Sequence, residues 1–395
     1  METYAADAVE RAMKTYEVIL RVKSRELTVW QAAEILSCTE RSVRRYRREI
    51  ESRGYRDFMD RRRRLPSPKR APAAEVGRLL ELYRTKYAGF TVKHFHDLAT
   101  RDDGVTLSYS FAKRVLQDAK LVKKRRARGK HRLRREPRAC FGEMLHLDGS
   151  EHAWLALCPD EKQTLIAVCD DATKRLLYAQ LHDAESTAVV LTALGDVVGT
   201  HGIPMALYTD RARWAFFTKT AGGRVEEKHP TQVGRALVKL GVEHIPSYSP
   251  QARGRGERLN RTLQDRLVNE LRLAKIRTVE AANRYLREKF IPDYDARFSR
   301  TPRDPASAFV PVRSVELDQV LCHEEERTVG QDNVVSFEGT KLQLSKQPGR
   351  RSCAGMRVLV RRHIDGSHSV WRATERLGRF DGKGRAIALP KALLA

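Results

Sequence analysis

Closely spaced cysteines are missing from this sequence. The six cysteines are scattered along the chain, and none has another within a few residues (Cys38, Cys140, Cys158, Cys169, Cys322 and Cys353). Structural zinc sites usually take pairs of ligands only a few residues apart, and disulfide-stapled domains are short and rich in cysteine. The spacing of the cysteines therefore excludes a structural zinc site and a disulfide framework. We expect reduced thiols, most of them packed in hydrophobic cores.

Long hydrophobic runs are also missing. No stretch approaches the roughly 18 apolar residues that a membrane-spanning helix needs, and the N-terminal residues are charged and polar. We therefore expect no signal peptide and no membrane partner.

Acidic residues are outnumbered. The 395 residues include 75 Lys and Arg against 50 Asp and Glu, which gives a formal net charge of +25. A cationic excess of this size, spread through the chain, indicates a nucleic acid rather than a membrane as the partner. A basic protein of the ribosomal type is the alternative on charge alone. The length predicts two or three domains.

A loop and helix near residue 256 carry the densest set of functional side chains. Residues 249–256 contain proline and glycine, and residues 256–272 predict a helix whose leucines recur every four residues on one buried stripe. Glu257 lies in the first turn of this helix. Three polar side chains follow on roughly the same face: Asn260, Arg261 and Gln264. An acid beside cationic and amide groups suits phosphodiester chemistry, although a lone Glu at a helix start is commonly just a favourable charge.

Two other acids follow short apolar strands. Residues 144–149 predict a strand that ends at Asp148, and residues 206–211 predict one that ends at Asp210. Acids at strand ends of an α/β sheet lie where such folds place ligands. Two carboxylates about 4 Å apart repel by roughly 4 kcal/mol at an effective dielectric constant of about 20. Three carboxylates therefore come together only where positive charge offsets their repulsion. Divalent metal ions bound by carboxylate oxygens usually supply that charge.

The acids Asp148, Asp210 and Glu257, the predicted strand order, and the segment Ser-Pro-Gln-Ala-Arg-Gly-Arg-Gly-Glu-Arg-Leu-Asn at 249–260 resemble the DDE transposases. These belong to the retroviral-integrase-like superfamily, and the similarity is greatest to insertion-sequence transposases of the ISNCY type. It covers residues 140–310 most clearly. The resemblance implies an RNase H-like core in which the three acids bind two Mg²⁺ or Mn²⁺ ions and catalyse cleavage and transfer of DNA strands.

Two departures from the family pattern are visible. More residues than usual separate Asp210 from Glu257, which fits an insertion around residues 218–231. Gln264 stands where many relatives carry Lys or Arg, so a neighbouring arginine is expected to make that DNA contact. The DNA contacts expected along this loop and helix are Arg253, Arg255, Arg258, Asn260, Arg261 and Gln264.

Residues 1–60 predict a helix-turn-helix domain. Thr28 is expected to cap a short amphipathic helix, and residues 37–39 supply a turn before a second helix. That helix is rich in arginine and is expected to enter the major groove of DNA. Its predicted DNA contacts are Arg41, Arg44, Arg45 and Arg48. A solvated basic helix in an α-helical bundle is the alternative.

The rest of the chain predicts a multidomain protein. A basic, proline-rich linker (61–73) leads to a second helical, helix-turn-helix-like domain (74–121), and a second basic linker (122–139) leads to the core. The core (140–312) is predicted as α/β with a mixed sheet, in which three strands precede alternating helix and strand. Residues 313–395 predict two hairpins and a small SH3-like β-barrel that binds DNA.

Together these predictions describe a DNA transposase that frees a 3′-hydroxyl at each end of its insertion sequence and joins it to target DNA. It is expected to bind double-stranded DNA as a homo-oligomer, in the bacterial cytoplasm with the nucleoid. A catalytically inactive DNA-binding regulator and an RNase H-fold nuclease or resolvase are the alternatives. Asp170 and Asp171, the remaining acids near a strand end, are predicted to form a turn.

Overall fold

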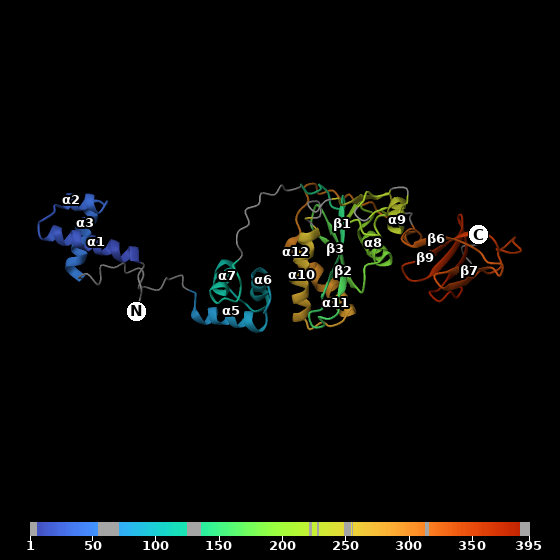
Figure 1. Ribbon diagram of the computed structural model, residues 1–395, viewed down its shortest axis with the longest axis horizontal. Helices are drawn as coiled ribbons and strands as arrows, with labels where there is room; N and C mark the ends of the chain where they lie inside the picture. Colours follow the sequence, from blue (N-terminus) through green and yellow to red (C-terminus); the bar gives the residue numbers. More distant parts are fainter. Residues whose placement is uncertain are drawn as a thin grey trace. The chain divides into compact units, whose positions relative to one another are not determined.

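The computed structural model describes residues 6–53, 71–124, 136–220, 223–226, 229–248, 254, 256–312 and 316–387 (Figure 1). The chain divides into two compact units, residues 1–81 and residues 82–395. No helix in the described part of the chain is long and apolar enough to span a membrane. The linkers predicted at 61–73 and 122–139 fall mainly outside the described residues.

The N-terminal unit contains a three-helix bundle formed by α1 (Ala6–Lys23), α2 (Val29–Ile35) and α3 (Glu40–Arg53). Thr28 caps α2 as predicted, because its side chain accepts from the backbone N–H of Gln31 while the Gln31 side chain accepts from the backbone N–H of Thr28. Ala32 and Ala33 are buried in the centre of the bundle with Val43 of α3. The predicted helical N-terminal region is therefore confirmed.

Three further helices precede the sheet: α5 (Ala73–Thr85), α6 (Val92–Asp102) and α7 (Tyr109–Asp118). Thr91 caps α6 and Ser108 caps α7, each by accepting a backbone N–H with its hydroxyl oxygen. Phe95 of α6 is fully buried and meets the rings of Tyr83 and Tyr87 edge-on. This segment thus has an aromatic core of its own.

The central sheet has five strands in the order β3-β2-β1-β4-β5. The first three strands pair antiparallel, whereas β4 and β5 run parallel to β1. The strands are β1 (Leu145–His152), β2 (Gln163–Asp170), β3 (Leu176–His182), β4 (Ala206–Thr209) and β5 (Glu243–Pro246). This order, with helices between the later strands, confirms the predicted mixed sheet.

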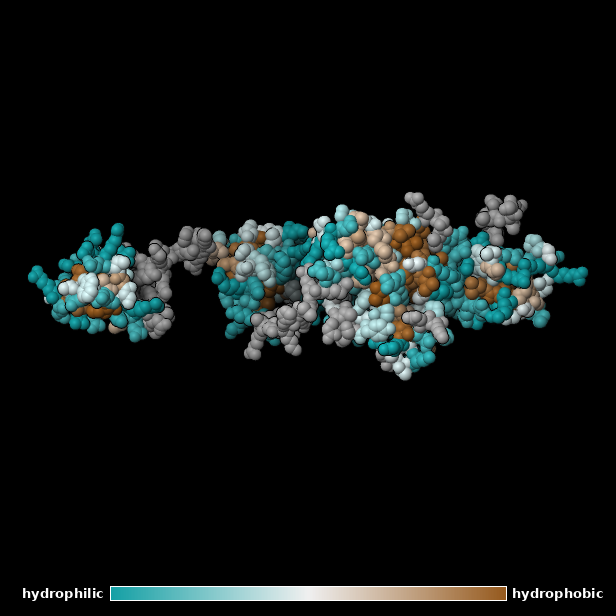
Figure 2. Space-filling model, turned by 90° about the horizontal axis from the view of Figure 1, so that it is seen from above, coloured by the Kyte–Doolittle hydropathy of each residue, from teal (hydrophilic) through white to brown (hydrophobic). Residues whose placement is uncertain are grey.

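Helices cover both faces of this sheet (Figure 1). One face packs against α8 (Thr187–His201) and α9 (Gln232–Leu240). The other packs against α10 (Gly256–Leu273), α11 (Val279–Tyr285), the π-helix η3 (Leu286–Phe290) and α12 (Ile291–Phe298). The predicted leucine stripe of α10 is buried in this second layer. Figure 2 shows a mainly hydrophilic surface, with its larger hydrophobic patches over the central core.

One strand boundary was predicted wrongly. β1 does not end at Asp148 but continues to His152, and residues 149–152 pair with β2 as far as the His152–Gln163 position. These four residues are Gly, Ser, Glu and His, which carry no apolar alternation, so their strand is set by the partner strand rather than by local preference. Asp148 therefore lies inside a strand, opposite Ala167.

The C-terminal part forms two sheets rather than one closed barrel within residues 316–387, where a barrel was predicted. After α13 (Leu317–Val320), the larger sheet has the order β11-β10-β9-β6, and the predicted hairpin β7–β8 forms the smaller sheet. Their apolar faces enclose one core that includes Val335, Phe337 and Val360. The strands are β6 (His323–Thr328), β7 (Val334–Phe337), β8 (Thr340–Gln343), β9 (Arg357–Arg362), β10 (His368–Arg372) and β11 (Glu375–Phe380).

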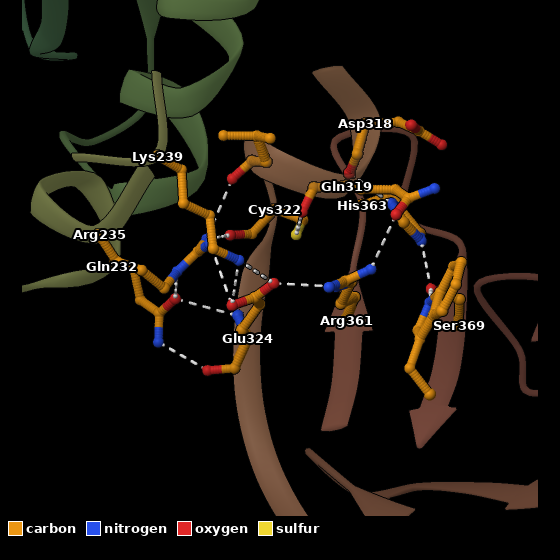
Figure 3. A network of polar contacts seen from close by, with 12 residues as sticks. Gln232, Arg235, Lys239, Asp318, Gln319, Cys322, Glu324, Arg361, His363 and Ser369 are labelled. Atoms are coloured by element: carbon orange, nitrogen blue, oxygen red, sulfur yellow. Dashed lines mark hydrogen bonds and ion pairs between the residues drawn. The ribbon is translucent and has the colours of Figure 1, made fainter. Parts of the chain in front are cut away.

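A buried ion cluster joins the C-terminal sheet to α9 (Figure 3). The Glu324 carboxylate of β6 lies 3.0 Å from Arg235 Nη1 and 2.9 Å from Lys239 Nζ of α9, and it accepts from Arg361 Nε of β9 at 2.8 Å. Burial acts to raise the pKa of Glu324, but these three cations outweigh it and lower the pKa. Arg361 thus serves the attachment of this sheet to the core.

Candidate active site

Of the predicted catalytic acids, Asp148 lies within β1 and Asp210 directly follows the parallel strand β4. β1 and β4 pair with His146 opposite Tyr208. Asp148 and Asp210 each lie two residues further along the chain, so this register places the two residues near each other at the carboxyl end of β4. Within the loop after β4, Asp210 Oδ1 accepts the backbone N–H of Ala212 at 2.9 Å. The topology therefore brings Asp148 and Asp210 together, as predicted from the strand pattern.

The first half of α10 lies directly on β1. Side chains in a strand alternate between faces, so Asp148 and Ser150 both project toward α10. On the helix, Asn260 and Gln264 are four residues apart and share a face. Asn260 Nδ2 donates to Asp148 Oδ2 at 2.8 Å, and Gln264 Nε2 donates to Ser150 Oγ at 3.0 Å. These two predicted DNA contacts hold the helix in register with the strand.

The helix start approaches Asp148 so closely that a side chain at Gly256 would displace the carboxylate or the helix. A methyl group built on Gly256 would lie 2.9 Å from Asp148 Oδ2. The first residue of α10 is therefore packed against the carboxylate, with the positive end of the helix dipole beside it. Glu257 follows in the same turn and is solvent-exposed.

The fit to divalent cations rests on the donor set. Asp148 and Asp210 offer hard oxygen ligands, and the Oδ1 atom of Asn260, whose amide nitrogen bonds Asp148, is buried without a hydrogen-bond partner among the described residues. Within the same described residues, no group of three or more His, Cys, Asp or Glu side chains already has the spacing of a metal site. In the described part of the chain, Asp148, Asp210 and Glu257 therefore do not form such a group.

A further carboxylate, Glu185, was missed in the sequence. A methyl group built on Gly149 would lie 2.5 Å from Glu185 Oε1, so the Glu185 carboxyl group occupies the space beside β1 that Gly149 leaves open. Although Glu185 is exposed over much of its surface, partial burial raises the pKa of its carboxyl group, and Asp210 and Asp148 raise it further. The indole N–H of Trp214 acts to lower the pKa of Glu185, although it makes no hydrogen bond of ordinary geometry within the described residues.

The sequence contained one signal for Glu185. Glycine inside a strand often marks the close approach of another group, and Gly149 follows Asp148 directly. What the sequence could not give is the identity of that group, because Glu185 precedes the N-cap of α8, more than thirty residues away in the chain.

Asp170 and Asp171 form the turn that was predicted for them. Asp170 accepts from the backbone N–H groups of Gly142 and Thr173 at 2.9 and 2.7 Å. Asp171 accepts from the backbone N–H of Arg138, and its other oxygen lies 2.7 Å from His146 Nε2. Both carboxylates are buried and bonded within the β2–β3 turn and the chain before β1, which is a structural role.

The predicted DNA-binding arginines lie in two places. On α3 all four are exposed, and Arg41, Arg45 and Arg48 line one shallow depression with Ser42, Glu49 and Ser52. Arg44 instead pairs with Glu40 at 2.8 Å. On α10, Arg258 and Arg261 are exposed, and Arg258 Nε donates to the carbonyl of Gly254 at 2.8 Å. Arg253 and Arg255 lie outside the described residues.

His244 of β5 supports the chain beside Asp210. The hydroxyl of Thr209 donates to the Asp210 carbonyl at 2.9 Å and lies 2.9 Å from His244 Nε2. Because that hydroxyl has a single hydrogen, His244 Nε2 must donate to it, which requires the neutral Nε2–H tautomer. Burial lowers the pKa of His244 to about 4, and its ring stacks on Phe216 with centroids 3.9 Å apart.

This pKa predicts an acid-dependent loss of stability. The unfolded chain takes up the proton near pH 6.5 whereas the folded chain takes it up only near pH 4, so stability is full above pH 6.5 and falls as the pH drops through this window. The pKa difference corresponds to about 3 kcal/mol. Chemical unfolding measured from pH 7 to pH 4 should show this loss in wild type and much less of it in His244→Gln. The same change at exposed His229 should leave the loss in place; an equal loss in His244→Gln would contradict the assignment.

Comparison with known proteins gives two relatives along most of the chain, while no family model matches. The protein y4bF of Sinorhizobium fredii, a transposase by name, is 32% identical over 367 residues, covering 91% of this chain and 79% of its own. The transposase for insertion sequence IS1202 of Streptococcus pneumoniae is 27% identical over 361 residues, covering 82% and 76%.

Solved structures also match, at low similarity. A simian T-cell lymphotropic virus intasome in complex with the PP2A regulatory subunit B56 gamma covers 78% of this chain and 99% of its own at 13% identity and a TM-score of 0.33. The HTLV-2 integrase catalytic core domain in complex with magnesium covers 37% and 85% at 13% identity and a TM-score of 0.29.

Proposed function

This chain belongs to the transposases, and we propose that it cleaves DNA at the ends of its insertion sequence and joins those ends to target DNA. The observation that carries the proposal is the placement of Asp148 in β1 beside Asp210, which directly follows the parallel strand β4, with the start of α10 packed onto Asp148. Glu257, in the first turn of α10, would complete the catalytic set.

The reaction has two steps, and in each an attacking oxygen replaces a 3′ oxygen at a phosphorus atom. First, a water oxygen bonds to the phosphorus at the element end and the bond to the 3′ oxygen breaks, which leaves a 3′-hydroxyl and a 5′-phosphate. Second, that 3′ oxygen bonds to a target phosphorus, and a target 3′ oxygen leaves. The second step conserves the number of phosphodiester bonds, so the protein mainly has to position groups and neutralise charge.

Two Mg²⁺ or Mn²⁺ ions would be held by Asp148, Asp210 and Glu257. Bound ions of this kind activate the attacking oxygen and stabilise the leaving one. Asn260 orients Asp148 through its 2.8 Å hydrogen bond, and Gln264 keeps α10 in register through Ser150. The raised pKa of Glu185 reflects partial burial and the carboxylates around it, an environment that added positive charge would relieve.

Recognition of DNA would come from arginines outside the acidic centre. The depression on α3 lined by Arg41, Arg45 and Arg48 would contact the element end, together with Arg44. Near the active site, Arg253, Arg255, Arg258 and Arg261 would bind phosphates close to the scissile bond. Since each DNA end needs an active site, we expect a homodimer or a larger homo-oligomer on DNA in the bacterial cytoplasm.

Movement of a marked DNA segment in cells tests the proposal. A plasmid would carry a marker between the genomic segments that flank this gene, and the protein would be supplied separately. We expect the marker to move with wild type and not with Glu257→Gln, which keeps the side-chain shape and removes the charge. Binding of both proteins to the flanks without any movement would favour a DNA-binding regulator, whereas cutting of the flanks without joining would favour a nuclease.

A further inference from the structure

Helix α6 packs against the second half of α10 through buried charges. Asp97 of α6 has only 4% of its side chain exposed and is surrounded by three cations. Its carboxylate lies 3.1 Å from Lys93 Nζ and 3.0 Å from Arg266 Nη2 of α10, and it also pairs with Arg297 of α12. This one carboxylate therefore links the helical segment to two helices of the core.

A second buried contact lies one helical turn away. His94 is fully buried, and its Nε2 lies 2.8 Å from Glu270 Oε1 of α10. The other oxygen of Glu270 accepts from the Tyr285 hydroxyl at 3.1 Å. At the edge of the interface, Arg272 of α10 donates to the carbonyl of Ala88 at 2.6 Å. The two acids and their partners thus fix α6 against α10 at several points along both helices.

A buried ionic interface of this kind fixes the position of α6 on α10 more than it adds to the free energy of unfolding. Burying charges costs free energy that their attraction only partly returns, and apolar residues of the same size would stabilise as well or better. Charged groups with defined partners, in contrast, allow only one register between two helices.

The helix that is held here is the one that carries the proposed catalytic side chains. α10 is continuous from Gly256 to Leu273, and Arg266 lies nine residues after Glu257, or about 14 Å along the helix axis. The first half of the helix bonds to β1 through Asn260 and Gln264. A shift of α10 at the Asp97 contact would therefore move Gly256 and Glu257 against Asp148.

On its other side, the helical segment presents cations to solvent. Lys113 and Arg114 of α7 are exposed, as are Lys120 and Lys123 just after it. An exposed helix with this charge suits the phosphates of a DNA end. The same compact segment thus connects a basic surface to the catalytic helix.

We propose that Asp97 and His94 are positioning residues that register the α6–α7 segment on α10, and so fix which phosphodiester of the bound DNA end is cut. The inference rests on the proposed function, because it assigns the cutting position of that same active site. In this account α7 holds the DNA end, α6 transmits its position through Asp97 and His94, and α10 presents the catalytic face at a set distance.

The test maps cut positions at single-nucleotide resolution. Full-length protein would be incubated with Mg²⁺ and a duplex that joins the flanking segment of this gene to neighbouring DNA, and the 3′ ends would be sequenced. The variant is Asp97→Asn, which keeps the shape but leaves Arg266 and Arg297 unmatched. The matched control is Asp265→Asn, the same change at an exposed acid of α10.

We expect wild type and Asp265→Asn to cut one phosphodiester. Asp97→Asn should cut that position about 100-fold more slowly, as displacement of reacting groups by about 1 Å does, and a larger share of its cuts should fall at neighbouring positions. Its affinity for the DNA should be unchanged. If circular dichroism shows that Asp97→Asn is unfolded, Glu270→Gln, which keeps the side-chain shape and one of the two acceptor oxygens, provides the same readout with a smaller shift.

Three results would overturn the inference. Folded variants that cut only at the wild-type position and rate would show that the contact sets no register. A slower rate with no change of position would reduce Asp97 to a stabilising residue. A wild-type protein that binds the duplex but never cuts it would overturn the proposed function, and with it the assignment of a cutting position.

Discussion

Asp148→Asn is expected to slow strand cleavage by about 1,000-fold while leaving DNA binding intact. Asparagine has the size of aspartate and keeps an oxygen that can accept from Asn260 Nδ2, so the packing of α10 on β1 should survive. The negative charge, however, is lost at the point where β1, β4 and α10 meet. Removing one preorganised electrostatic group from an active site costs about 100- to 1,000-fold in rate, and the loss of a metal-binding charge should reach the upper end of that range.

The measurement for Asp148→Asn is cleavage of labelled end DNA by purified protein, with binding followed separately by fluorescence anisotropy. Asp160→Asn is the matched control, because Asp160 is an exposed acid in the β1–β2 connection. The basic side chains proposed to bind DNA are untouched in both variants. Cleavage by Asp148→Asn at close to the wild-type rate would remove Asp148 from the catalytic set.

Gly256→Ala should lower activity without lowering stability. The added methyl group would lie 2.9 Å from Asp148 Oδ2, so either the carboxylate turns or the start of α10 moves. A displacement of about 1 Å at reacting groups lowers rates by about 100-fold. Alanine at a position with ordinary backbone angles also restricts the unfolded chain, which favours folding by about 0.4–1 kcal/mol. A fall in activity with an unchanged or higher melting temperature is therefore the expected pair of results.

The control for Gly256→Ala lies two residues earlier in the chain. A methyl group on Gly254 would meet its nearest neighbour, Arg258 Nη2, only at 3.9 Å, which is ordinary contact. Gly254→Ala should therefore retain most of the cleavage rate. Equal rates for Gly256→Ala and wild type would show that the close approach of α10 to Asp148 has no part in the chemistry.

Much of the fold could be predicted because local signals and tertiary packing agree there. The leucine stripe of α10 marks the helix and its buried side, and Thr28 marks the start of α2. Gly241, with φ of 71°, marks the end of α9, since few other residues adopt that conformation. At these positions the residue type favours one local structure, so the sequence alone predicts the helix boundary or the buried face.

The predictions failed where pairing with a distant segment decides the structure. β6 is the charged run His-Glu-Glu-Glu-Arg-Thr, which carries no apolar alternation, yet it pairs along β9 and buries Glu324 among the cations of two other elements. Residues 149–152 of β1 likewise lack apolar alternation and form a strand because they pair with β2. In the site, the sequence indicated the shared helix face of Asn260 and Gln264, but only the packed structure shows that side chains of β1 bond their amide groups. Their contact with DNA stays a prediction.

The movement of a marked segment in cells tests the central claim most directly, because it requires binding, cutting and joining by one protein. The claim is that Asp148, Asp210 and Glu257 together make this chain an active transposase. It predicts that wild type moves the marker into new sites and that Glu257→Gln, at equal expression and with equal binding to the flanks, does not. Movement with Glu257→Gln at the wild-type frequency would contradict the assignment of this exposed glutamate, and with it the proposed three-carboxylate site.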